Sequence, residues 1–180
     1  MNPVENNPLM RLRIFLRDHR VLDGDARVPQ GQTLATYLAS RNRYVNLTTV
    51  EWLGTGETIP HMALKVNTIL WASSPDGGLP ISTGVPSAVS RRVELELTGG
   101  YLLGAGLLLV DQQRLTDYLR SAPGFLPLRQ AELRPRGKTL GDIVVNHEAV
   151  NVVREVDPFD ERDLEAAGVS PSWQPEPRDQ

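Results

Sequence analysis

Arginines spaced for contact with phosphate are the first chemical feature of the sequence. Arg11, Arg13 and Arg17 are separated by even intervals, so an extended strand places them on one face. A row of guanidinium groups on one face is typical of proteins that bind a nucleic-acid backbone. Because the chain has 22 acidic against 19 basic residues, a solvated strand face is the competing interpretation. The candidate nucleic-acid contacts are Arg11, Arg13, Arg17, Arg20, Arg134, Arg136 and Lys138.

Two glutamates and three histidines are the candidates for acid–base or metal chemistry. Glu51 and Glu132 occupy equivalent positions of an internal repeat, and paired carboxylates can perform acid–base catalysis. A glutamate on the solvent face of a strand is the simpler interpretation. His19, His61 and His147 occupy no equivalent positions, and the sequence has no HExxH, GxSxG or P-loop motif. We therefore expect no catalytic residue, no metal and no cofactor, and a protein that is not an enzyme.

The elements that position these residues follow from the internal repeat. Residues 33–72 align without a gap on residues 114–153, and the apolar pattern is kept throughout. Upstream, the alignment continues after a shift of one residue, which matches Gly24 with Gly104. A unit of this size is near the lower limit for independent folding. We therefore expect the two copies to bury a face against each other as a pseudo-twofold pair.

Hydrophobic periodicity predicts the same order of elements in each copy. Residues 93–97 alternate apolar and polar, which indicates a strand, and Gly104 and Gly106 in the next strand favour a β-bulge or a close backbone approach. The expected elements of the second copy are a hairpin over 93–97 and 101–110, a helix over 114–120, and strands over 125–133 and 142–153. The fold class is therefore mainly β (α+β), with two tandem ββαββ small-barrel or sheet domains and a C-terminal helix over 158–167.

Composition marks the expected boundaries. Ser, Pro and Gly dominate residues 73–90, which favours a linker, and residues 154–180 are strongly acidic. The predicted organisation is a flexible N-terminus (1–10), a first β-rich repeat (11–72), a linker (73–90), a second β-rich repeat (91–153), and an acidic C-terminal helix with a disordered tail (154–180).

The second copy carries a pattern that resembles a known family. Val93, Leu95 and Leu97, then Gly99, Leu102 and Gly104, then Asp111 resemble the first half of the Sm-like motif. The resemblance implies a small β-barrel and RNA binding by loop residues near the acid, although Arg114 and Leu115 stand where the family has an asparagine. The repeat as a whole, with its Leu-x-x-Tyr-Leu helix, is similar to an uncharacterised bacterial tandem-repeat domain family.

These observations lead to three hypotheses about function. The chain has no cysteine, no apolar stretch long enough to span a bilayer and no export signal, so we expect a cytoplasmic protein. The first hypothesis is a non-catalytic protein-binding or assembly module, with a protein partner or self-association and no membrane contact. The second is an Sm-like nucleic-acid (RNA) binding module. The third is a small-molecule site between the domains, lined by Glu51, Glu132 or His61.

Overall fold

A computed structural model describes residues 7–84 and 88–156 of the chain. Ten strands form one antiparallel sheet, accompanied by two short α-helices. The prediction of a mainly β fold is therefore confirmed. Among the described residues the sheet is not closed, because β4 and β10 each have a single hydrogen-bonded neighbour.

The same succession of elements occurs in the two halves of the chain. The first half has β1 (Leu9–Leu16), β2 (Val21–Arg27), α1 (Leu34–Ala39), β3 (Tyr44–Trp52), β4 (Thr58–Lys65), the 3-10 turn η1 (Val66–Thr68) and β5 (Ile69–Ser73). The second half has β6 (Ala88–Leu97), β7 (Tyr101–Val110), α2 (Leu115–Ser121), β8 (Phe125–Arg134), β9 (Lys138–Asn146), the 3-10 turn η2 (His147–Ala149) and β10 (Val150–Glu155).

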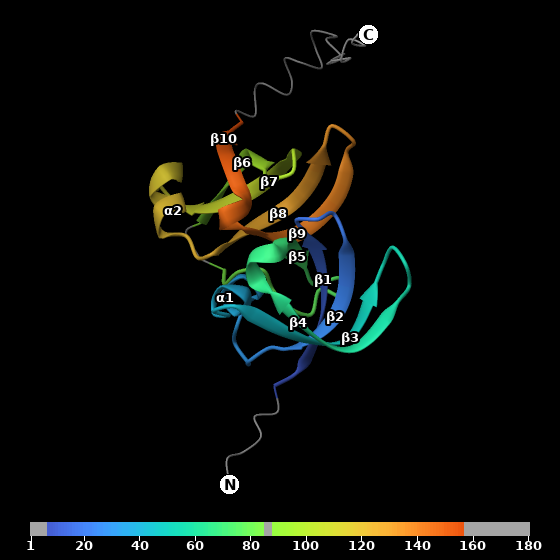
Figure 1. Ribbon diagram of the computed structural model, residues 1–180. Helices are drawn as coiled ribbons and strands as arrows, with labels where there is room; N and C mark the ends of the chain where they lie inside the picture. The colour runs from blue at the N-terminus through green and yellow to red at the C-terminus, as the bar shows by residue number, and fades with distance from the viewer. Residues whose placement is uncertain (1–6, 85–87, 157–180) are drawn as a thin grey trace, which may run out of the picture.

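The order of strands shows how the halves meet. The sheet runs β10-β6-β7-β8-β9-β5-β1-β2-β3-β4, so the fourth strand of the second half pairs with the fifth strand of the first (Figure 1). A pseudo-twofold axis would bring two equivalent strands together. The predicted pseudo-twofold pair with facing apolar sides is therefore wrong: the halves join head to tail, edge to edge.

Strand register corresponds between the halves with a constant difference of residue number. Leu16 pairs with Ile69, and Leu97 pairs with Val150, each number being 81 higher. The β2–β3 and β7–β8 pairs obey the same relation and carry a bulge at the same place. The predicted irregularity at Gly104 and Gly106 is thus confirmed, but the one-residue shift is wrong, since Gly24 corresponds to Ala105.

Each half has its own hydrophobic core, and each core includes side chains from the other half. Phe125 and Val144 of the second half belong to the first core. Leu70 and Trp71 of the first half belong to the second core. The edge-to-edge joint is therefore also a place where the two cores interlock.

Several predicted boundaries differ from the structure. The segment 142–153, expected as one strand, contains the end of β9, the turn η2 and most of β10. β1 begins inside the expected flexible N-terminus, and β10 includes the first residues of the expected C-terminal segment. Between β5 and β6, the backbone carbonyl of Pro80 accepts a hydrogen bond from Leu34 N–H at 2.8 Å, so part of the expected linker packs on α1. The predicted helix 158–167 and the tail lie outside the described residues.

Candidate functional site

The joint between the halves is a short antiparallel pairing of β5 and β9. Trp71 lies opposite Val145, and Ala72 lies opposite Val144. Across the same joint, Asn146 Nδ2 donates a buried hydrogen bond to the Ile69 carbonyl at 3.0 Å. The joint thus combines backbone pairing with a side-chain amide, which is the kind of contact that fixes register between strands.

The backbone geometry explains why β9 can accept β5. Opposite Val144 lies Pro127, which has no N–H and cannot exchange a pair of hydrogen bonds with it. Next to the pair of Phe125 and Asn146, the His147 N–H donates to the Gly124 carbonyl at 2.9 Å, which gives the same alternation. Val144 therefore directs its N–H and C=O away from β8 and toward Ala72.

Side chains lock this pairing from both directions. Phe125 is 2% exposed, and Val144 and Ala72 are fully buried. Helix α1 of the first half contacts β8 of the second. On the other face, Phe15 stacks on Trp71 with ring centroids 4.0 Å apart. The joint is therefore a packed interior interface, at which removal of an apolar side chain costs stability.

The strands at the two outer edges of the sheet correspond to the two strands of the joint, but each has no neighbour on its outer side in the described residues. β4 corresponds to β9, and β10 corresponds to β5. Tyr44, which corresponds to the buried Phe125, is 53% exposed, and Val152, which corresponds to Trp71, is 44% exposed. Ala63, the counterpart of Val144, is exposed as well. Among the described residues, the sheet therefore ends in two unoccupied versions of its own internal joint.

The arginines of the first hairpin are placed side by side but are paired with acids. Arg13 donates to both carboxylate oxygens of Asp23 at 2.8 Å, and this hydrogen bonding raises the pKa of Arg13. Arg11 donates to Asp25 at 3.2 Å. Both acids come from the neighbouring strand β2. The stripe of positive charge expected from the sequence is thus largely neutralised in place.

The remaining predicted basic residues are spread over several elements. Arg20 pairs with Asp18 and stacks over Trp52 at 4.4 Å, and Arg17 has guanidinium nitrogens buried without a hydrogen-bond partner. Arg134 donates to Glu94 at 2.8 Å, and Arg154 donates to the other oxygen of the same carboxylate at 2.7 Å. Arg136 lies in the turn between β8 and β9, and Lys138 begins β9.

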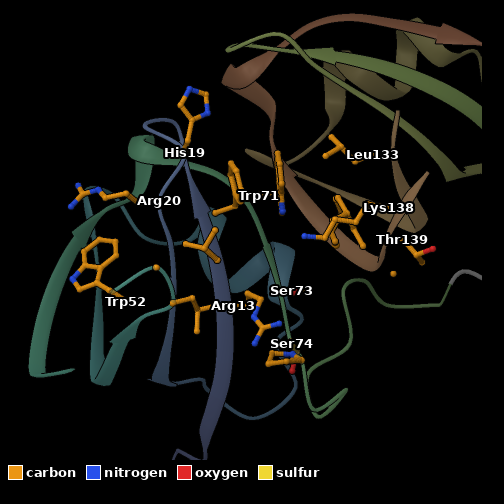
Figure 2. A pocket seen from close by; sticks show the side chains of 18 of the residues that line it. Arg13, His19, Arg20, Trp52, Trp71, Ser73, Ser74, Leu133, Lys138 and Thr139 are labelled. Carbon is orange, nitrogen blue, oxygen red and sulfur yellow. The ribbon is translucent and has the colours of Figure 1, made fainter. Parts of the chain in front are cut away.

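A groove of about 1010 Å³ lies between the first hairpin and the β8–β9 hairpin, and it brings three of these residues together (Figure 2). Arg13, Arg20 and Lys138 line it together with Trp52, Trp71 and the acids Glu57 and Asp142. Its floor includes the Phe15–Trp71 stack, on which Tyr101 packs edge-on. Burial raises the pKa of Tyr101. Aromatic walls and mixed charges suit a small polar ligand better than a polyanion.

The residues expected to line a small-molecule site do not line this groove. Glu51 lies on β3, 3.9 Å from Arg11, and Glu132 lies on β8 of the other half. His61 is exposed on β4. Within residues 7–84 and 88–156, no three His, Asp or Glu side chains are placed to hold a metal ion. Neither helix in the described part of the chain has the length and apolar character needed to cross a membrane.

Comparisons with protein-family models, with curated proteins and with solved structures found no match. The assignment of a site therefore depends on the geometry of this chain.

Sequence reasoning missed the joint, although the sequence contains a signal for it. Residues 69–72 and 143–145 are unbroken apolar runs, which are typical of strands covered on both sides. The counterpart of residues 69–72 is interrupted by Asn151, whereas the counterpart of residues 143–145, residues 62–64, is apolar as well. The polar residue therefore distinguishes the edge strand β10 from the interior strand β5, and no such signal distinguishes β4 from β9.

Proposed function

We propose that the protein is a non-catalytic binding and assembly module that captures an extended protein strand at the ends of its sheet. The single observation that supports this is the internal joint, in which one sheet edge of this fold already holds a strand in a packed interface. Exposed strand edges are generally blunted, because unpaired N–H and C=O groups recruit other chains. Recognition by addition of a strand uses these same groups.

The β4 edge is the better-defined receptor of the two. The Val66 N–H donates to the Arg43 carbonyl at 2.8 Å, so Ala63, opposite Asn46, directs its N–H and C=O away from β3. Beside it, the ring of Tyr44 is half exposed. Backbone groups for pairing and an apolar surface for an anchoring side chain are thus adjacent.

The experiment uses the strand that occupies the internal joint. A fluorescent peptide with the sequence of residues 66–74 is titrated onto the full-length protein, and anisotropy is recorded. We expect saturable binding that is weakened at least about tenfold by Ala63→Pro, which removes one outward N–H. Ala63→Ser keeps that N–H and is the matched control. Absence of binding, or equal binding to both variants, contradicts the proposal.

Nucleic-acid binding is the alternative function, and it has a test of its own. The pairing of Arg11 and Arg13 with Asp25 and Asp23 argues against a free phosphate-binding stripe. RNA and DNA titrations at two salt concentrations test it directly, since phosphate contacts make affinity fall steeply with salt. Salt-sensitive binding lost in Arg11→Ala with Arg13→Ala would favour this alternative over the assembly module.

A further inference from the structure

Corresponding residues at the joint and at the two edges differ mainly in whether they are covered. On the receiving side, Phe125 and Val144 are buried in the joint, whereas Tyr44 and Ala63 are exposed at the β4 edge. The half containing Tyr44 has the same strand order and register as the half containing Phe125. The β4 edge therefore has the strand order and the pairing register of the joint around these residues, without an inserted strand.

On the inserting side, the same comparison holds for β5 and β10. Trp71 and Ala72 are buried against β9. Their counterparts, Val152 and Val153, pair on their inner side with Glu96 and Leu95 in the register that Trp71 and Ala72 adopt with Phe15 and Ile14. The outer side of β10 has no strand beside it in the described chain.

Resting on the proposed function, we infer that the strand captured at the β4 edge is β10 of a second copy of this chain. The joint between copies repeats the internal one, with Val153 opposite Ala63 and Val152 opposite Leu64, as Ala72 lies opposite Val144 and Trp71 opposite Val145. The contact joins two different edges. Each added chain therefore exposes the same pair of edges again until the assembly closes on itself.

The joint between copies is weaker than the one within the chain. Val152 replaces the indole of Trp71, and Asn151 stands where the fully buried Leu70 does. Lys65 occupies the position of Asn146, whose amide bonds across the internal joint. Less apolar area is thus buried, so the assembly is reversible and dependent on concentration.

Disulfide trapping tests the register of β10 against β4 of the next copy. The natural chain contains no cysteine, so only introduced cysteines can form a cross-link. Opposed residues of an antiparallel pair have Cα atoms about 4.5 to 5.5 Å apart, within reach of a disulfide. The double variant Ala63→Cys with Val153→Cys should form reducible cross-linked oligomers on oxidation. The control Ala63→Cys with Val110→Cys should not, although Val110 is 44% exposed like Val152.

Single variants distinguish the head-to-tail contact from a symmetric one. Val153→Cys alone should stay uncross-linked, since position 153 meets position 63 of the next chain. A cross-linked dimer of this single variant indicates β10 against β10 and overturns the inference. Absence of cross-linking above the control in the double variant overturns it as well. Peptide capture at Ala63 is measured separately, so the proposed function can survive that failure.

Sedimentation velocity provides a second measurement on a chain without cysteine. Val152→Glu places a charge at a residue of β10 that is 44% exposed and should shift the protein to the monomer at concentrations where the unaltered chain is assembled. Val110→Glu adds the same charge at an equally exposed valine of β7 and should leave assembly unchanged. A monomeric unaltered chain over the whole accessible concentration range, or equal effects of both variants, refutes the inference.

Discussion

Phe125 and Tyr44 occupy corresponding positions, yet the structure predicts very different consequences when each is replaced by alanine. Phe125 is 2% exposed and packs in the core of the other half, so Phe125→Ala should lower the free energy of unfolding by about 3 to 5 kcal/mol. For a chain of this size, the melting temperature should fall by roughly 6 to 20 °C.

Tyr44→Ala is the matched control at the open edge. Tyr44 is 53% exposed, and in the separated chain its loss should change the free energy of unfolding by less than about 0.5 kcal/mol. At high protein concentration, the proposed assembly should add stability to the unaltered chain by mass action. Tyr44→Ala should therefore remove most of the concentration dependence of the melting temperature.

Urea unfolding at low protein concentration, followed by tryptophan fluorescence, measures both losses. Scanning calorimetry over a range of concentrations measures the second effect. Equal losses for the two variants would refute the reasoning, since they would show that the joint and the edge are packed alike. A loss below about 1 kcal/mol for Phe125→Ala would show that the halves do not interlock.

Three further outcomes are expected from stability measurements by urea unfolding. Gly24→Ala brings a methyl group to 3.3 Å from side-chain atoms of the buried Val50 and Leu47 and should lower the free energy of unfolding by about 1 to 3 kcal/mol. Adding Val50→Ala should restore that stability, because the corresponding positions of the second half hold the natural pair Ala105 and Ala131. No rescue by Val50→Ala would disprove overpacking. Arg13→Ala removes the guanidinium from a carboxylate that is 10% exposed and should cost about 1 to 3 kcal/mol, with a smaller loss in an Asp23→Asn background. Burial raises the pKa of Tyr37, so the neutral phenol stabilises the fold below pH about 10, and that contribution is lost as the pH rises further. Tyr37→Phe should therefore lose less stability at alkaline pH than the unaltered chain. Equal losses in the two proteins would contradict this explanation.

Local patterns predicted the elements but not the way the halves meet. The Leu-x-x-Tyr-Leu pattern of the repeat indicates a helix in each half, and in α1 the Thr33 cap forms a reciprocal bond with Thr36. The sequence predicts one strand over 142–153, because residues 147–149 contain no glycine or proline. The structure has the turn η2 there, which separates β9 from a fifth strand, β10.

The candidate site shows the same limit at longer range. Arg13 was assigned to a phosphate-binding stripe because strand alternation exposes it. Only the register of β1 with β2 places Asp23 against it, and register is a property of two strands. Likewise, the corresponding runs 69–72 and 150–153 differ in polarity, but the meaning of that difference depends on knowing which of them is inside the sheet.

Pro60, which lies in β4 three residues before Ala63, has a consequence for solubility. Proline cannot donate to a ladder, and natural edges use it to oppose uncontrolled strand addition. The internal joint engages only two residues on each strand, a length that fits beside Pro60. Under the proposed strand capture, an edge built in this way would accept a short, matched segment while resisting the long, indiscriminate stacking that leads to amyloid.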